Sequence, residues 1–296
     1  MSSVETMRYP SLDRFSRTVS ISPDALVEAF ELERDFHTRI LAESDPGKRA
    51  RLYEDIYGLV HPIYERGLTA PPPPPDWNPK QHLISLFEEE LRDRDVLDVG
   101  CGQGHFLRGL RAAGHRGRLV GLDVTPPREP IDGVEFRRSS VVSFLLDERF
   151  DVVMSDNVYE HVAPADAAVH LRSIRDSLRP GGLAIILTPS RLFGPWDVTR
   201  IVDDSYRGRV PAQGTHLNET TYRELCGCLK TCGFVRCRSV IPLARIRPTL
   251  QTVRFPAALL GWLELVPGLV AAVRVWSRKL HLPALEVTVI ARRPAP

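Results

Sequence analysis

Apolar residues fall into two patterns along the chain. Short, nearly continuous apolar runs at 96–99, 119–122, 150–154 and 183–187 are typical of buried strands. The first run leads into a glycine-rich stretch, after which apolar residues recur at helical spacing within 106–110. The pattern therefore predicts a strand, a tight turn and a helix start in direct succession.

The first quarter of the chain has a helical pattern. Residues 22–66 predict helices, with a start signal at Ser22-Pro23-Asp24 and a break at Asp45-Pro46-Gly47. The proline run 71–75 cannot continue a helix and predicts a stiff, extended linker. We therefore expect a helical extension with a proline linker over residues 1–75, followed by the one main domain over 76–296.

The glycine-rich turn is the strongest candidate for ligand binding. Gly100, Gly102 and Gly104 allow positive φ and a close approach of the backbone to a ligand. A dinucleotide fingerprint G-x-G-x-x-G would need a third glycine where His105 stands, so a nicotinamide site fits poorly. The carboxylate of Asp98 would repel a pyrophosphate but attract a ligand that carries positive charge.

Asp98 to Gly104 resembles the D-x-G-x-G-x-G signature of the class I S-adenosylmethionine-dependent methyltransferases. Residues 119–123, 150–162 and 178–189 resemble three further segments of that family, in the same order. The resemblance implies an α/β, Rossmann-like fold with a seven-stranded sheet, mostly parallel with an antiparallel last strand. The sixth and seventh strands are expected near 234–241 and 285–292.

The resemblance also implies the cofactor site. Asp123, at the end of the second strand, would accept hydrogen bonds from both ribose hydroxyls. The acid that binds adenine in many relatives is absent here, which leaves Ser140 and Val141 for the base. The expected residues for S-adenosylmethionine are Asp98, Gly100, Cys101, Gly102, Gly104, Asp123, Val124, Ser140, Val141, Asp156 and Asn157.

Three segments depart from a minimal fold of this kind. The prolines between residues 123 and 134 predict an irregular crossover without a helix. The polar segment 190–221 is long enough to be a lid. The insertion 243–283 is rich in apolar residues and predicts a helix pair, but Glu264, Pro267 and Arg274 interrupt it, so a membrane-spanning helix is not expected.

Two histidines are the candidate catalytic residues. Imidazole titrates near neutral pH, so His161 or His216 could take the proton of an acceptor hydroxyl. The structural alternatives are that His161 orients its loop and that His216 holds the lid closed. No metal is expected, because Asn157 stands where metal-dependent relatives with a Glu-x-x-Glu-His pattern have their first Glu. The cysteines in 226–237 lack paired C-x₂-C spacing and are interpreted as packing residues.

Composition limits the classes of partner. With 39 basic and 37 acidic residues the formal charge is +2, so no nucleic-acid partner is expected. Five cysteines do not suggest a disulfide framework, and residues 1–20 lack the apolar run of a secretory signal, so a cytoplasmic location is the default. A homodimer and weak, non-inserting contact with a membrane surface are left open.

These observations favour a methyltransferase that uses S-adenosylmethionine on a small molecule. O-methylation of a bacterial-type natural product or a sugar is the preferred reaction, on the strength of the resemblance alone. Three alternatives are retained: an N- or C-methyltransferase acting on a small molecule or lipid, an NAD-dependent oxidoreductase, and a non-catalytic scaffold that keeps the cofactor fold.

Overall fold

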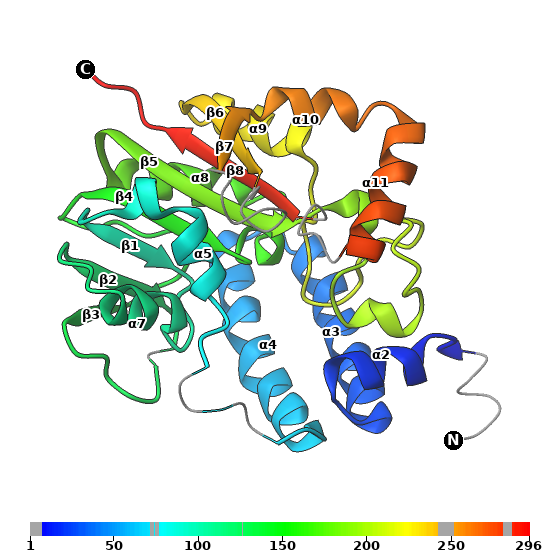
Figure 1. Ribbon diagram of the computed structural model, residues 1–296. Helices are drawn as coiled ribbons and strands as arrows, with labels where there is room; N and C mark the ends of the chain where they lie inside the picture. The colour runs from blue at the N-terminus through cyan, green and yellow to red at the C-terminus, as the bar shows by residue number, and fades with distance from the viewer. Residues whose placement is uncertain (1–7, 72–73, 75–76, 126, 242–251, 281–285) are drawn as a thin grey trace.

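The computed structural model describes residues 8–71, 74, 77–125, 127–241, 252–280 and 286–296 (Figure 1). Helices cover both faces of one twisted sheet, and a separate group of N-terminal helices packs beside it. The helices are α2 (Leu12–Val19), α3 (Pro23–Ala42), α4 (Pro46–Gly67), α5 (Gln81–Leu86), α6 (Glu88–Leu91), α7 (His105–Ala112), α8 (Ala167–Ser177), α9 (Tyr222–Thr231), α10 (Ala258–Leu263) and α11 (Pro267–Leu280), with short 3-10 turns η1 (Tyr159–His161), η2 (Arg191–Phe193) and η3 (Val198–Ile201). The strands are β1 (Val96–Val99), β2 (Leu119–Asp123), β3 (Val134–Arg138), β4 (Phe150–Asp156), β5 (Leu178–Pro189), β6 (Val235–Ile241), β7 (Val253–Pro256) and β8 (Glu286–Arg292).

The sheet order is β3-β2-β1-β4-β5-β8-β6-β7. Strands β1 to β5 are mutually parallel, and β5 pairs with β8 in the antiparallel direction. The chain runs outward from β1 to β3 and then returns to place β4 on the other side of β1. Open α/β sheets bind ligands at such a reversal, beyond the carboxyl ends of the strands.

The α/β fold with an antiparallel end is confirmed, but the expected number of strands was wrong. An eighth strand, β7, lies in the insertion and pairs with β6, with Val253 opposite Ile241 and Phe255 opposite Ser239. Valine and phenylalanine favour strands, and β6 offers an unpaired edge. The sequence pattern hid this strand because only four residues of the apolar insertion form it.

The crossover between β2 and β3 has no helix in the part of the chain that the structure describes, as its prolines predict. It folds back on the glycine turn instead. A Cβ atom on Gly104 would lie 2.5 Å from Ile131 Cδ1, so only glycine fits here without movement of Ile131.

The N-terminal helices begin where the sequence predicts. Ser22 caps α3 by accepting a hydrogen bond from the amide of Ala25, and Asp45 caps α4 by accepting one from Lys48 at 2.8 Å. These helices share an apolar core with residues of the predicted lid, among them Val198 and Leu217. The extension is therefore packed against the segment that follows β5.

The insertion contributes α10 and α11 after β7. The Glu264 carboxylate accepts hydrogen bonds from the amides of Tyr222 (2.8 Å) and Arg223 (3.2 Å), which stabilises the first turn of α9. Among the described residues, no helix has both the length and the apolar character needed to cross a membrane.

Candidate active site

The glycine turn after β1 has the backbone geometry that its sequence predicts. Gly100, Gly102 and Gly104 all have positive φ, at +72°, +50° and +72°. The amide of Gly102 donates to Asp123 Oδ2 at 2.9 Å, which ties the ends of β1 and β2 together. No atom lies within 4 Å of the position that a Cβ on Gly102 would take, so this side of the turn is open to a ligand.

Three carboxylates gather at the carboxyl ends of β1, β2 and β4. Asp98 is only 4% exposed, and burial raises its pKa well above the ordinary value, with the negative charges of Asp156 and Asp123 adding to the effect. Lys80 forms an ion pair with Asp156 and offsets part of the charge. The remaining negative charge favours a ligand that brings cations, such as the ammonium and sulfonium of S-adenosylmethionine.

The other predicted cofactor residues lie at the same sheet edge, on the segments after β2, β3 and β4 or in the glycine turn. Ser140 Oγ accepts from the amide of Val142 at 3.1 Å, and the Val141 carbonyl accepts from His170 Nδ1 at 2.7 Å. Val124 is half-buried after Asp123. These backbone and side-chain contacts fix the loop that would face the base.

Two predicted cofactor residues flank this cradle. Cys101 is half-buried in the glycine turn, and burial raises the pKa of its thiol, so it is a neutral packing group. Asn157 has φ +54° and its amide donates to the Leu187 carbonyl at 3.0 Å, while its side chain is exposed at the end of β4.

The loop after β4 packs against the glycine turn through Val158 and leads into the predicted catalytic residue His161. A Cβ atom on Gly100 would lie 2.4 Å from Val158 Cγ2. Two and three residues further on, Glu160 and His161 lie on η1. His216 approaches from the lid segment, with its ring centroid 4.8 Å from that of His161. The structure thus brings the two histidines together from positions 55 residues apart in the sequence.

Each side chain of this cluster is held by a hydrogen bond. His161 Nδ1 donates to the Thr215 carbonyl at 3.1 Å, and His216 Nδ1 donates to Glu219 Oε1 at 2.9 Å. Thr188 Oγ1 donates to Glu160 Oε2 at 3.0 Å. The other oxygen, Glu160 Oε1, is buried and has no hydrogen-bond partner.

The two imidazoles differ in protonation. Burial and the neighbouring His216 lower the pKa of His161 to about 3, so it is neutral at physiological pH. Burial alone would also lower the pKa of His216, but its hydrogen bond to Glu219 and the charges of Asp197 and Glu160 outweigh that effect and raise it to about 9. Burial raises the pKa of Glu160 to about 7.

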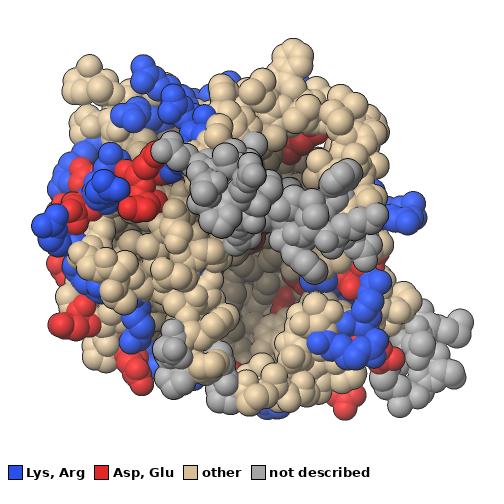
Figure 2. Space-filling model, viewed as in Figure 1, with Lys and Arg blue, Asp and Glu red and all other residues tan. Residues whose placement is uncertain are grey.

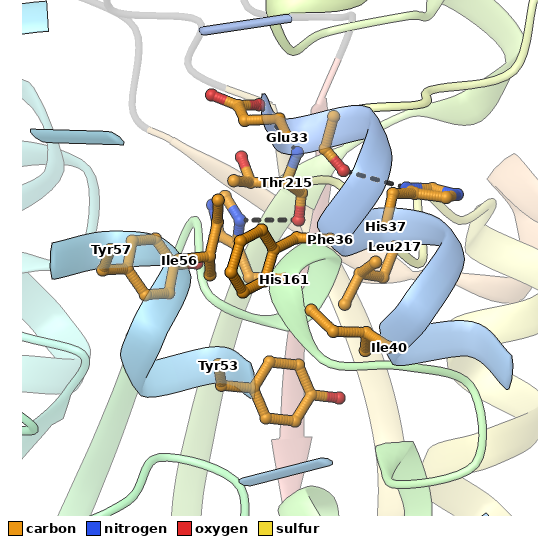
Figure 3. Close-up of a pocket in the computed structure, with 11 residues that line it drawn as sticks. Glu33, Phe36, His37, Ile40, Tyr53, Ile56, Tyr57, His161, Thr215 and Leu217 are labelled. Carbon is orange, nitrogen blue, oxygen red and sulfur yellow. Dashed lines mark hydrogen bonds between the residues drawn. The ribbon is translucent and has the colours of Figure 1, made fainter. Parts of the chain in front are cut away.

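Side chains of the N-terminal helices α3 and α4 surround His161. Figure 3 shows His161 among side chains of α3 and α4, with its hydrogen bond to Thr215 drawn and the Tyr57 ring beside it. The Tyr57 and His161 rings meet edge to face, with centroids 6.0 Å apart. The pocket there has a volume of about 10 Å³, which is room for one water molecule, so it does not accommodate an acceptor in this conformation.

The surface of the molecule also has a hollow, separate from this small pocket. Figure 2 shows the molecule hollowed between the sheet side and the N-terminal helices.

A family model described as a methyltransferase domain matches residues 78–237, which is more than half of the chain. The chain belongs to the class I S-adenosylmethionine-dependent methyltransferases. S-adenosylmethionine is the cofactor of this family, as the sequence predicts. That prediction depended on the glycine turn and on the acids Asp98 and Asp123.

Individual relatives agree with this assignment. The methyltransferase is 31% identical over 162 residues to the ubiquinone biosynthesis O-methyltransferase of Methylobacterium sp. (strain 4-46), covering 51% of this chain and 63% of the relative. It is 32% identical over 149 residues to a probable S-adenosylmethionine-dependent methyltransferase of Mycolicibacterium smegmatis, covering 48% of this chain and 52% of the relative. The alignments thus span less than two thirds of either relative.

A solved structure shows the same fold over a larger part of the chain. The 1,6-didemethyltoxoflavin-N1-methyltransferase of Burkholderia thailandensis, solved with 1,6-didemethyltoxoflavin and S-adenosylhomocysteine, gives a TM-score of 0.50 at 18% identity. The alignment covers 85% of this chain and 92% of that structure.

The sequence alone did not point to several residues of the methyltransferase site. Lys80 precedes the first strand and Tyr57 lies in the helical extension, and neither stands in a recognisable pattern. Glu160 lies in the segment 150–162 that resembles the family, but no signal in the sequence marks it as part of the site. Since each acts through contacts with segments far away in the sequence, local spacing carried no signal for it.

Proposed function

We propose that this methyltransferase transfers the methyl group of S-adenosylmethionine to a hydroxyl of a small molecule, in a natural product or a sugar. The observation that carries this proposal is the contact between the glycine turn and the η1 loop, because it sets His161 beside the cofactor cradle. The name of the Methylobacterium relative, an O-methyltransferase, supports an oxygen acceptor.

The chemistry needs little beyond positioning. The acceptor oxygen attacks the methyl carbon in line with the C–S bond, the O–C bond forms, and sulfur keeps the electron pair as a thioether. The sulfonium is already a good leaving group, so exclusion of water and orientation supply much of the rate. The protein must also help the hydroxyl lose its proton, and we assign that role to His161, the neutral imidazole of the pair, with His216 beside it.

The packing of the extension supports a small acceptor. Residues 214–217 of the lid are held by α3 through a hydrogen bond from Thr215 N to Glu33 Oε2 at 2.9 Å and one from His37 Nδ1 to the Gly214 carbonyl at 2.8 Å. The lid is thus tied to the extension close to His161 and His216. A lid held against the extension suits a compact acceptor better than a polymer.

Cofactor binding can be tested with a matched pair of glycine variants. We expect Gly102→Arg to abolish calorimetric binding of S-adenosylhomocysteine, because the new side chain fills the open side of the turn. Gly181→Arg is the control, since Gly181 also has positive φ (+78°) and no atom within 4 Å of its Cβ position. Equal binding by the two variants would show that the cofactor lies elsewhere.

The acceptor is tested by mass spectrometry of products from panels of phenols, sugars and amines. Methyl transfer to a hydroxyl supports the proposal, whereas methylation of nitrogen or carbon alone would favour the alternative reaction. NAD-dependent turnover without methyl transfer would contradict the proposed O-methylation.

A further inference from the structure

Three potential metal ligands converge beside the proposed acceptor position. One ligand atom each from Glu160, His161 and His216 lies within 4.8 Å of the others, and this is the one such group among the described residues. Three atoms at that spacing can all lie about 2.8 Å from one central point, and Zn²⁺ ligand bonds are about 2.0–2.2 Å. A movement of under about 1 Å therefore closes the set on one ion.

The hydrogen bonds around the three ligands leave their inner atoms available. His161 and His216 both use Nδ1, toward Thr215 and Glu219, which leaves Nε2 of each ring for a metal ion. On His216 the ion would displace the proton that this imidazole otherwise carries. Histidines that bind metals usually donate their other ring nitrogen to a carbonyl or a carboxylate, and one of each is present here.

The carboxylate completes the argument. Glu160 Oε2 is held by Thr188, but Oε1 is buried without any partner, although a buried carboxylate oxygen left unpaired is costly. A bound cation would satisfy that oxygen. His170 shows the contrast: it is also buried, with Nδ1 bound to a carbonyl, but it belongs to no such group among the residues described.

We propose that Glu160, His161 and His216 bind one divalent transition-metal ion such as Zn²⁺ or Mn²⁺. Two imidazoles and one carboxylate favour such ions over Mg²⁺ or Ca²⁺, which prefer oxygen ligands alone. This replaces the expectation of no metal, which rested on Asn157. The Glu-x-x-Glu-His pattern covers only residues 157–161 and so omits His216, which the fold brings to the site from the lid.

The site deepens the proposed function and rests on it for its role. Three protein ligands leave coordination positions open, and a hydroxyl bound there has a lowered pKa and can release its proton to water. His161 and His216 then assist proton loss as ligands of the ion. The same ion would tie the lid to the loop after β4.

Metal binding is measured directly, without reference to turnover. The full chain is stripped with a chelator and dialysed against Zn²⁺ or Mn²⁺, and bound metal is counted by elemental analysis for the wild type, Glu160→Gln, Glu219→Gln and the control His170→Gln. We expect the wild type and His170→Gln each to bind one more equivalent of metal than Glu160→Gln. Any metal bound by the five cysteines is the same in all variants and cancels in this difference. Glu219→Gln keeps the acceptor for the Trp196 amide but weakens the support of His216, so it should reduce affinity about 10- to 100-fold.

The far-UV circular dichroism spectrum and the urea-denaturation midpoint of each variant report an intact fold. Equal metal content in the wild type and Glu160→Gln, or no metal in either, overturns the site. Metal binding without methyl transfer to any hydroxyl would leave the site standing and refute the proposed reaction, so the two failures are distinguishable.

Discussion

Glu33 is a buried acid at the junction between the extension and the lid. Burial and the charge of Asp197 raise its pKa to about 7, although hydrogen bonds from Tyr64 and Thr215 oppose the shift. A Cβ on Gly214 would lie 2.4 Å from Glu33 Oε2 and 2.7 Å from Asp197 Oδ2, so the two carboxylates lie close to each other on the same side of this glycine.

This pKa predicts a pH-dependent stability. Because the folded state binds the proton of Glu33 more tightly than the unfolded state, whose pKa is near 4.5, its stabilising effect is complete below pH 4.5 and is lost as the pH rises through 7. The wild type should lose about 3 kcal/mol of its free energy of unfolding over this pH range through Glu33, and Glu33→Gln should not show this loss. Urea denaturation of both proteins at pH 5 and pH 8 measures the difference, and parallel losses of stability would contradict it.

At the scale of elements, one buried ion pair connects α4 to the start of α8. Arg49 donates through Nε and Nη2 to Asp166 at 2.6 and 2.5 Å, and the two side chains are 5% and 8% exposed. Tyr53 donates to the same carboxylate at 3.0 Å and accepts from the amide of Ala163 at 2.8 Å. These bonds are polar contacts in an otherwise apolar interface.

We predict that Arg49→Ala lowers the free energy of unfolding by about 3–5 kcal/mol, because it leaves the Asp166 carboxylate buried without its partner. Arg92→Ala serves as the matched control, since the Arg92–Glu88 pair is 70% and 69% exposed and should contribute under about 1 kcal/mol. Similar midpoints of urea denaturation for the two variants would show that α4 is held by apolar packing alone.

The elements that could be predicted from the sequence are those determined by local signals. The glycine turn, the capped starts of α3 and α4, and the irregular crossover all follow from residue types within a few positions of each other. β7 and the Glu33–Thr215 contact depend on partners that are distant in the sequence, and no local pattern encodes them. The same holds for His216, because the fold of the lid, and no local pattern, places it beside His161.

At the scale of the whole molecule, the insertion leaves an apolar surface uncovered. Figure 2 shows few charged side chains over α10. Trp262 is 75% exposed and Leu265 is 58% exposed, and neighbouring apolar side chains extend this surface along α11. The charge near it is smaller than the sequence suggests, because Arg254 is paired with Glu90.

We predict that this surface gives weak, non-inserting association with lipid vesicles, driven by apolar contact more than by charge. In co-sedimentation at low salt, part of the wild-type protein should pellet with the vesicles, and the double variant Trp262→Ser, Leu265→Ser should stay in the supernatant. Leu145→Ser is the control, because Leu145 is 82% exposed but lies after β3, outside the insertion. A wild-type protein that remains in the supernatant would rule out the lipid surface and leave the apolar face to another partner.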